Sequence, residues 1–178
     1  MNETNNKTRL TYPKLVITGQ SRHGKDTACE ILQESFDYTF TSSSRFVAKL
    51  LFQEFKEKYK YLNIEECFQD RHNHRKEWYD FICLYNKEDK AKLSKEIFKQ
   101  NDIYCGIRST EELQALKEAG LANLIIWIDA TERLGKTESN SSITISPKDC
   151  DVVIENNGSI IEFKENLLKF FRILTALN

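Results

Sequence analysis

Short apolar runs separated by longer amphipathic or polar stretches recur along the whole chain. The first run, 14–18, is rich in β-branched residues and stops at Gly19, a pattern typical of a buried parallel strand. The next stretch, 25–35, places Ala28 and Leu32 on one face of a predicted helix. Strands separated by helices predict an α/β fold, in which a parallel sheet has helices on both faces. The other predicted strands cover 38–41, 102–105, 124–128 and 151–154.

The middle of the chain predicts helices rather than strands. Serines at 42–44 suit a helix N-cap, and the apolar periodicity beyond them predicts helices over 45–59, 71–85 and 87–100. The region 45–100 is too long for one crossover connection, so we expect a helical cap inserted over a functional site.

Two further helices are predicted towards the C-terminus. Ser109 with Glu112 three residues later forms a capping-box pattern, and the helix behind it is expected to end near Gly120. The last helix follows an Asn-Asn-Gly turn at 156–158 and ends near Leu177.

Length and charge narrow the classes of protein to consider. The 178 residues fit a single domain, 1–178, whose polar start, 1–12, is expected to be flexible. The net charge is −1, with 26 basic and 27 acidic residues, which argues against a protein that mainly grips nucleic-acid phosphates. No run approaches ~18 apolar residues, so we expect no membrane span and a cytoplasmic location, in the host cytoplasm if the protein is viral. The five cysteines include no CxxC pair and are expected to be reduced.

One motif has specific chemistry. Gly19, Gly24 and Lys25 match G-x-x-x-x-G-K, with an apolar strand before the motif and an amphipathic helix after it. Its glycines let backbone N–H groups turn inward, and these donors form an anion site with the helix N-terminus. Lys25 is predicted to reach the β- and γ-phosphates of ATP, in a sheet of the P-loop NTPase type. The alternative is a chance turn in which Asp26 only caps the helix.

The other loop residues are also assigned to cofactor binding. Asp26 takes the usual place of Ser or Thr and Thr27 follows, an order that resembles nucleoside monophosphate kinases. Thr27 is predicted to contact phosphate or a Mg²⁺-bound water, and Asp26 to hold Mg²⁺ through water or to act on the acceptor. Arg22 either contacts phosphate oxygens or faces solvent. For His23, packing or hydrogen bonding is favoured over a role as catalytic base.

The densest polar cluster runs from Asp70 to Trp78. On one continuous helix, residues 71, 74, 75 and 78 would share a face. Guanidinium groups suit a phosphate and an aromatic ring suits a base, while Asp70 is a candidate to accept a proton or bind Mg²⁺. The alternative is a solvated charged helix with Trp78 in the core. The predicted acceptor-binding residues are Arg45, Arg71, Arg75 and Trp78.

Two arginines follow predicted strands in the second half of the chain. Arg108 comes just after a strand end, where α/β sheets place their ligand residues, and is predicted to stabilise the transferring phosphoryl group. The alternative is a structural pair with a carboxylate. Arg133 begins a polar loop, 133–142, which is either a small lid over the nucleotide or a plain surface loop.

Parts of this sequence resemble bacteriophage deoxynucleoside monophosphate kinases. The likeness includes Gly-Lys-Asp-Thr in the loop and the segment Asp-Val-Val-Ile-Glu-Asn-Asn-Gly-Ser at 151–159. Arg-Ser-Thr-Glu-Glu at 108–112 and the Ala-Gly pair before a hydrophobic strand also belong to it. The resemblance covers both ends of the chain and is weaker over 45–100.

This resemblance implies ATP-dependent phosphorylation of a deoxynucleoside monophosphate to its diphosphate, with Mg²⁺. It places Lys25 and Thr27 on the ATP phosphates and Arg108 near the transferred group. Family members often have an acidic residue two places before that arginine, where this chain has Gly106. Asp26, Asp70 and Asp129 are therefore the candidates for the carboxylate that organises Mg²⁺.

Two other functions fit the same motif. One is a kinase that phosphorylates a hydroxymethylated pyrimidine base in phage DNA, and DNA is an expected partner only in that case. The other is a nucleotide-binding module without catalysis; the chain lacks the Asn-Lys-x-Asp motif of a GTPase. Under the main hypothesis the partner is a small-molecule nucleotide, no membrane is involved, and a homodimer stays open.

Overall fold

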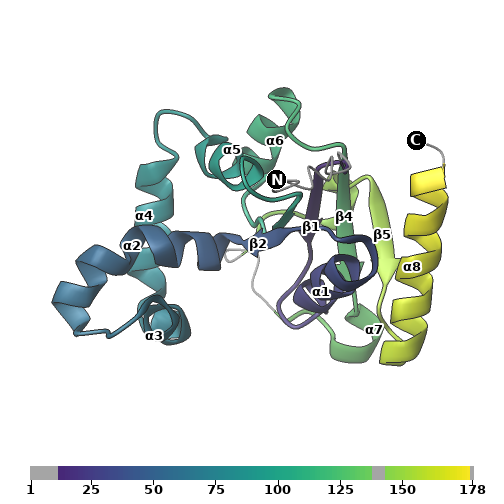
Figure 1. Cartoon of the computed structure of the whole chain (residues 1–178), viewed down its shortest axis with the longest axis horizontal. Coiled ribbons are helices and arrows are strands. Elements are labelled where there is room, and N and C mark those ends of the chain that lie inside the picture. The colour runs from purple at the N-terminus through teal and green to yellow at the C-terminus, as the bar shows by residue number, and fades with distance from the viewer. Residues whose placement is uncertain (1–11, 138–142, 177–178) are drawn as a thin grey trace, which may run out of the picture.

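A five-stranded parallel sheet forms the centre of the protein (Figure 1). The computed structural model describes residues 12–137 and 143–176, so all but the last residue of the predicted N-terminal lead-in lies outside the described residues. The strand order is β2-β3-β1-β4-β5, which confirms the predicted α/β fold. The strands are β1 (Leu15–Thr18), β2 (Phe40–Ser42), β3 (Ile103–Cys105), β4 (Leu124–Asp129) and β5 (Val152–Glu155).

Helices cover both faces of this sheet because neighbouring strand residues point to opposite sides. Leu15 and Ile17 of β1 pack with α1 (Lys25–Phe36) and α8 (Ile160–Ala176) in one buried cluster. Val16, between them, belongs to a second cluster, which includes side chains of the middle helices and of α6 (Thr110–Glu118). The near-continuous apolar character of the strands is therefore explained by burial on both faces.

The strand order brings the functional loops together. β1 lies between β3 and β4, so the chain leaves β1 at the point where successive connections go to opposite sides of the sheet. Ligands of open α/β sheets bind at such a point, beyond the carboxyl ends of the strands. Here these ends lead into the loop after Thr18, into Gly106 after β3, into α7 (Thr131–Leu134) after β4 and into Asn156 after β5.

Most of the helical insertion projects beyond the β2 edge of the sheet, at the opposite end from α8, and only its last helix lies beside α6 (Figure 1). It contains more breaks than predicted. One helix was not predicted, although Asn63 with Glu66 three residues later is a capping signal: the Asn63 side chain accepts from the N–H of Glu66 at 2.9 Å. The elements of the insertion are α2 (Ser43–Tyr59), α3 (Ile64–Gln69), the 3₁₀ turn η1 (Asp70–His72), α4 (Arg75–Tyr85) and α5 (Lys92–Phe98).

The predicted continuous helix over 71–85 is wrong. The carboxylate of Asp70 accepts hydrogen bonds from Asn73 at 2.5 Å, from the ring of His74 at 3.1 Å and from the hydroxyl of Tyr61. Such local side-chain bonds compete with helical backbone bonds, and the chain leaves helical geometry at residues 73–74 before α4 begins. Arg71 and Trp78 consequently do not lie on one helix.

The predicted capping box forms only in part, because the Glu112 side chain has other partners. The Ser109 side chain caps α6 by accepting from the N–H of Glu112 at 3.4 Å, as predicted. The Glu112 carboxylate, however, is buried and accepts from Ser94 at 2.9 Å and from Tyr104 at 3.0 Å. Burial raises the pKa of Glu112, the two hydrogen bonds act in the opposite direction, and the resulting pKa is about 7.

Among the described residues, no helix combines the length and apolar character needed to cross a bilayer.

The stability of this fold should fall as Glu112 ionises. A carboxyl whose pKa rises on folding, here from 4.5 to about 7, favours the folded state at low pH and loses that advantage as pH rises through about 7. The pKa difference corresponds to about 3 kcal/mol. We therefore expect Glu112→Gln, which keeps an acceptor for Ser94 and Tyr104, to gain stability relative to the native protein between about pH 5 and pH 8. Urea unfolding at both pH values measures this, and parallel pH profiles would contradict it.

Candidate functional site

The loop after β1 has the backbone of an anion site. Gly19, Arg22 and Gly24 have φ angles of 141°, 63° and 98°, which turn the chain repeatedly within six residues. Lys25 begins α1 and is only 8% exposed. Its ammonium group donates to the carbonyl of Gln20 at 2.6 Å, across the loop. A cation held over a ring of backbone groups at a helix N-terminus is suited to phosphate oxygens.

Two of the loop glycines are required by space as well as by φ. A Cβ at Gly19 would lie 2.4 Å from the carbonyl oxygen of Ile128 in β4. A Cβ at Gly24 would lie 2.4 Å from the side-chain nitrogen of Asn156, just after β5. The loop is therefore pressed against the ends of two neighbouring strands, so its shape depends on the sheet.

Asp26 and Thr27 follow Lys25 in the first turn of α1. Asp26 is exposed and Thr27 half-buried, so their oxygen atoms are accessible beside the loop. The thiol of Cys105, the last residue of β3, lies 3.7 Å from a carboxylate oxygen of Asp26. Asp26 therefore places a carboxylate beside the end of β3, although β3 itself ends without one.

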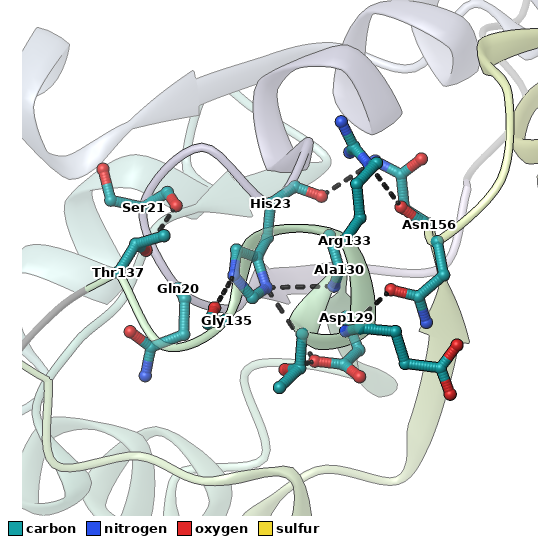
Figure 2. Close-up of polar contacts among 12 residues, drawn as sticks. Gln20, Ser21, His23, Asp129, Ala130, Arg133, Gly135, Thr137 and Asn156 are labelled. Carbon is teal, nitrogen blue, oxygen red and sulfur yellow. Dashed lines mark hydrogen bonds and ion pairs between the residues drawn. The ribbon is translucent and has the colours of Figure 1, made fainter.

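The His23 ring is not available to a nucleotide, which corrects its assignment as a cofactor-binding side chain. The ring is fully buried, and Figure 2 shows it between the loop and the segment after β4. Its Nδ1 accepts from the N–H of Ala130 at 3.0 Å, and Nε2 lies 3.1 Å from the carbonyl of Gly135. Packing and hydrogen bonding is thus the role that the structure gives this ring.

A cavity of about 260 Å³ opens beside the loop. Asn156 links its walls: its side-chain amide donates to the carbonyl of His23 at 2.9 Å, and its own carbonyl accepts from Arg133 Nε at 3.3 Å (Figure 2). Arg22 and Arg133 are exposed at its rim. The cavity is lined by Arg22, Gly24, Thr27, Arg133, Asn156, Gly158 and Ile160.

Two arginines of the insertion flank one aromatic ring. The guanidinium groups of Arg71 and Arg45 lie 4.0 Å and 4.3 Å from the ring centre of Phe68. Arg71 also donates to the carbonyl of Phe68 at 2.8 Å, and Arg45 pairs with Glu65 at 3.0 Å. The sequence analysis missed Phe68, although an aromatic residue three places before Arg71 was a visible signal.

The charge of Arg71 connects the insertion to the phosphate loop. Burial lowers the pKa of Arg71, while the carboxylate of Asp26 acts in the opposite direction and Arg45 and Arg75 lower it further. Asp26 belongs to α1 and Arg71 to η1. Arg71 is therefore near enough to the start of α1 for its charge to interact with the carboxylate of Asp26. Arg75 is exposed and approaches the ring of His72 at 3.4 Å.

Two predicted site residues, Trp78 and Asp70, make contacts other than the expected ones. Trp78 is 5% exposed and packs in the core, so the prediction that it offers a flat face to a base is wrong: its indole contributes to apolar burial. Asp70 is held within the insertion by Tyr61, Asn73 and His74. The catalytic role expected of Asp70 therefore stays a prediction.

Arg108 follows β3 at the expected edge of the sheet. The carbonyl of Ile107, directly before it, accepts from the hydroxyl of Thr18 at the end of β1 at 2.7 Å. The carbonyl of Arg108 accepts from the N–H of Thr144 at 3.0 Å, and the side chain of Arg108 is exposed.

The predicted lid is described only up to Thr137, because 138–142 lie outside the described residues. No group of three or more His, Cys, Asp or Glu side chains within the described part of the chain could hold a metal ion.

Comparison with solved structures identifies the fold. Shikimate kinase from Acinetobacter baumannii, in complex with shikimate, matches with a TM-score of 0.52 and 13% identity, over 94% of this chain and 96% of that one. Dephospho-CoA kinase from Campylobacter jejuni matches with a TM-score of 0.52 and 15% identity, over 90% and 96%. TT1252 from Thermus thermophilus matches with a TM-score of 0.50 and 18% identity, over 94% and 100%.

Neither a family model nor a curated protein sequence matches this chain. At these identities the structural matches concern the arrangement of the backbone. The chain has the α/β fold of P-loop kinases, and its chemistry has to be argued from its own residues.

Gly19→Ala tests how tightly the loop is built. The new methyl group would collide with the carbonyl of Ile128 at a φ that L-residues avoid. We expect unfolding free energy to fall by more than about 3 kcal/mol, because steric overlap adds to the ~1–2 kcal/mol of the left-handed backbone. Gly120→Ala is the control, since Gly120 also has positive φ but open space around it. Equal losses in urea unfolding would show that the contact is not restrictive.

Proposed function

We propose that this protein transfers the γ-phosphoryl group of ATP to the phosphate of a deoxynucleoside monophosphate. One observation supports this most directly: Lys25 closes the phosphate loop, and the charge of Arg71 in the insertion interacts with the carboxylate of Asp26, the residue after Lys25. Two cationic regions near each other are what a reaction between two phosphate groups needs.

The donor nucleotide fits on the side of the loop where the cavity opens. Its phosphates would replace the Gln20 carbonyl as the partner of Lys25 and accept from the loop N–H groups. The base and sugar would then enter the cavity of about 260 Å³, where Arg22 and Arg133 lie at the rim and Ile160 provides apolar surface. The buried Asn156 fixes the back of this cavity.

The residues beside the loop also suit Mg²⁺. This ion prefers oxygen ligands and usually binds through one or two protein groups together with substrate phosphates and water. Asp26 and Thr27 provide a carboxylate and a hydroxyl at adjacent positions of α1. Asp26 is the better of the three candidate carboxylates, because Asp70 is engaged in the insertion and Asp129 accepts from Thr131 at 2.5 Å. Bound there, Mg²⁺ would neutralise charge between the donor phosphates.

The acceptor phosphate is assigned to the arginine cluster. Arg71 and Arg45 are oriented by the same aromatic ring, and Arg75 adds positive charge nearby. A phosphate monoester is largely ionised at neutral pH, so its oxygen can attack without a general base. Transfer then depends on alignment and on charge stabilisation by Lys25 and Arg108. This mechanism has no need for Asp70.

A panel of acceptors tests the assignment. The native protein is incubated with labelled ATP, Mg²⁺ and each of the four deoxynucleoside monophosphates, then with hydroxymethylated ones, with DNA containing hydroxymethyl bases, and with shikimate or dephospho-CoA. Labelled diphosphate from one or more free monophosphates supports the proposal. Label appearing only in DNA, or only in the other small acceptors, replaces it, and ATP binding without transfer to any acceptor indicates a non-catalytic module.

Lys25→Met should reduce turnover by orders of magnitude. The substitution removes the charge that meets the β- and γ-phosphates but keeps an unbranched side chain of similar length in α1. Because the sheet and core do not depend on that charge, the circular dichroism spectrum and the unfolding midpoint should stay close to native. Native-like turnover by a folded Lys25→Met protein would reject the phosphate-loop assignment.

Arg71→Ala should act on the acceptor and leave the donor unaffected. Loss of a charged hydrogen bond to phosphate is expected to raise the KM of the monophosphate about 10- to 100-fold, with the KM of ATP within about twofold of native. Lys76→Ala is the matched control, since the Lys76 side chain is 86% exposed and pairs with Asp80 on the outside of α4. Equal changes in both KM values would place Arg71 elsewhere in the mechanism.

A further inference from the structure

The phosphate loop contains a buried histidine, His23, which does not line the cavity beside the loop. His23 is fully buried, although it lies between Gly19 and Lys25 and directly follows Arg22, which is exposed. Figure 2 shows the ring bonded at both nitrogen atoms to the segment that follows β4. The loop and this segment are more than 100 residues apart in sequence.

The hydrogen bonds define the tautomer of the ring. A backbone N–H can only donate, so Nδ1 must accept from Ala130 at 3.0 Å and has no proton. The proton of the neutral ring is then on Nε2, which donates to the carbonyl of Gly135 at 3.1 Å. The carboxylate of Asp129 is 3.8 Å from Nδ1, beyond hydrogen-bonding distance, and it accepts from Thr131 instead.

These two bonds hold both ends of α7. Ala130 directly precedes the helix and Gly135 directly follows it. α7 has only four residues, and so short a helix has little stability of its own. Its orientation therefore depends on external contacts, to which Thr137 adds a bond from its hydroxyl to the carbonyl of Ser21 at 2.6 Å.

The same helix bears Arg133, at the rim of the cavity beside the loop. Arg133 donates to the carbonyl of Asn156, whose side chain donates back to the carbonyl of His23. Loop, α7 and the end of β5 thus form a closed circuit of hydrogen bonds. Displacing the ring would remove the bonds at both ends of α7 and leave the helix held by Asn157, which accepts from the N–H of Glu132 at 3.2 Å, and by the bonds of Arg133 and Thr137.

We propose that His23 is a positioning residue, whose neutral ring fixes α7 so that Arg133 can contribute to nucleotide binding. This rests on the proposed function, because it assumes that a nucleotide occupies the cavity next to the loop. In this arrangement the His23 ring touches no ligand, and its effect on nucleotide binding passes through α7 and Arg133.

Two substitutions separate the bonds of the ring. His23→Asn retains an acceptor near the position of Nδ1 for Ala130 but cannot reach Gly135. His23→Gln retains a donor near the position of Nε2 for Gly135 and loses the acceptor for Ala130. Each is combined with Arg133→Ala, and the Kd of Mg²⁺-ATP is measured by calorimetry for all single and double variants, with urea unfolding as a check of folding.

We expect Arg133→Ala to weaken ATP binding about 10-fold in the native background and less than about twofold in either His23 variant. Such non-additivity shows that both residues act through one route, whereas a general loss of stability would leave the effect of Arg133→Ala unchanged. Multiplicative effects in a folded double variant overturn the positioning role. Failure of the native protein to bind ATP overturns the proposed function, and this inference with it.

A second measurement applies if neither His23 variant folds. Hydrogen exchange of the native chain is then followed over 130–135, with and without a non-hydrolysable ATP analogue. Exchange that slows at least several-fold when the analogue binds supports the coupling of loop and α7. Exchange that is unchanged, although the analogue binds, overturns it.

Discussion

The backbone of Gly19 passes so close to the carbonyl of Ile128 that a single methyl group would collide with it. This contact presses the phosphate loop against β4, and Gly24 meets Asn156 after β5 in the same way. The shape of the loop, the start of α1 and the inward direction of Lys25 all depend on it. A ligand site of this kind is preorganised, because packing against the sheet orders the loop before a ligand binds.

Three of the cations around the loop share one feature: each donates to a main-chain carbonyl. Lys25 donates to Gln20, Arg71 to Phe68 and Arg133 to Asn156. These bonds orient the side chains, but a charged phosphate oxygen is a stronger acceptor than a carbonyl. The site thus holds its positive groups in place with partners that a phosphate can displace. The aromatic ring of Phe68 does the same for Arg45 and Arg71 without any competing negative charge of its own.

The local sequence pattern was sufficient to predict the strands and most of the helices, because apolar periodicity indicates directly which faces are buried. All five predicted strands are present to within two residues at each end, and Gly19, Gly24 and Lys25 form the expected loop. Prediction was wrong in the insertion, where Asn63 begins an unpredicted helix and the bonds of Asp70 break a predicted one. There, polar side chains compete with the helix backbone, and helical periodicity alone does not reveal the outcome.

The sequence by itself determined the sheet, the phosphate loop and the chemistry that a Gly-Lys-Asp-Thr segment can perform, since these depend on neighbouring residues. Only the tertiary structure decided the direction of individual side chains. Trp78 is in the core, the His23 ring is turned to α7, and Phe68 orients the arginines. Each of these outcomes depends on contacts between residues far apart in the chain or on turns between helices. The spacing of residue types along the chain does not predict such contacts, because the burial and the partners of a side chain are determined only when separate elements pack together.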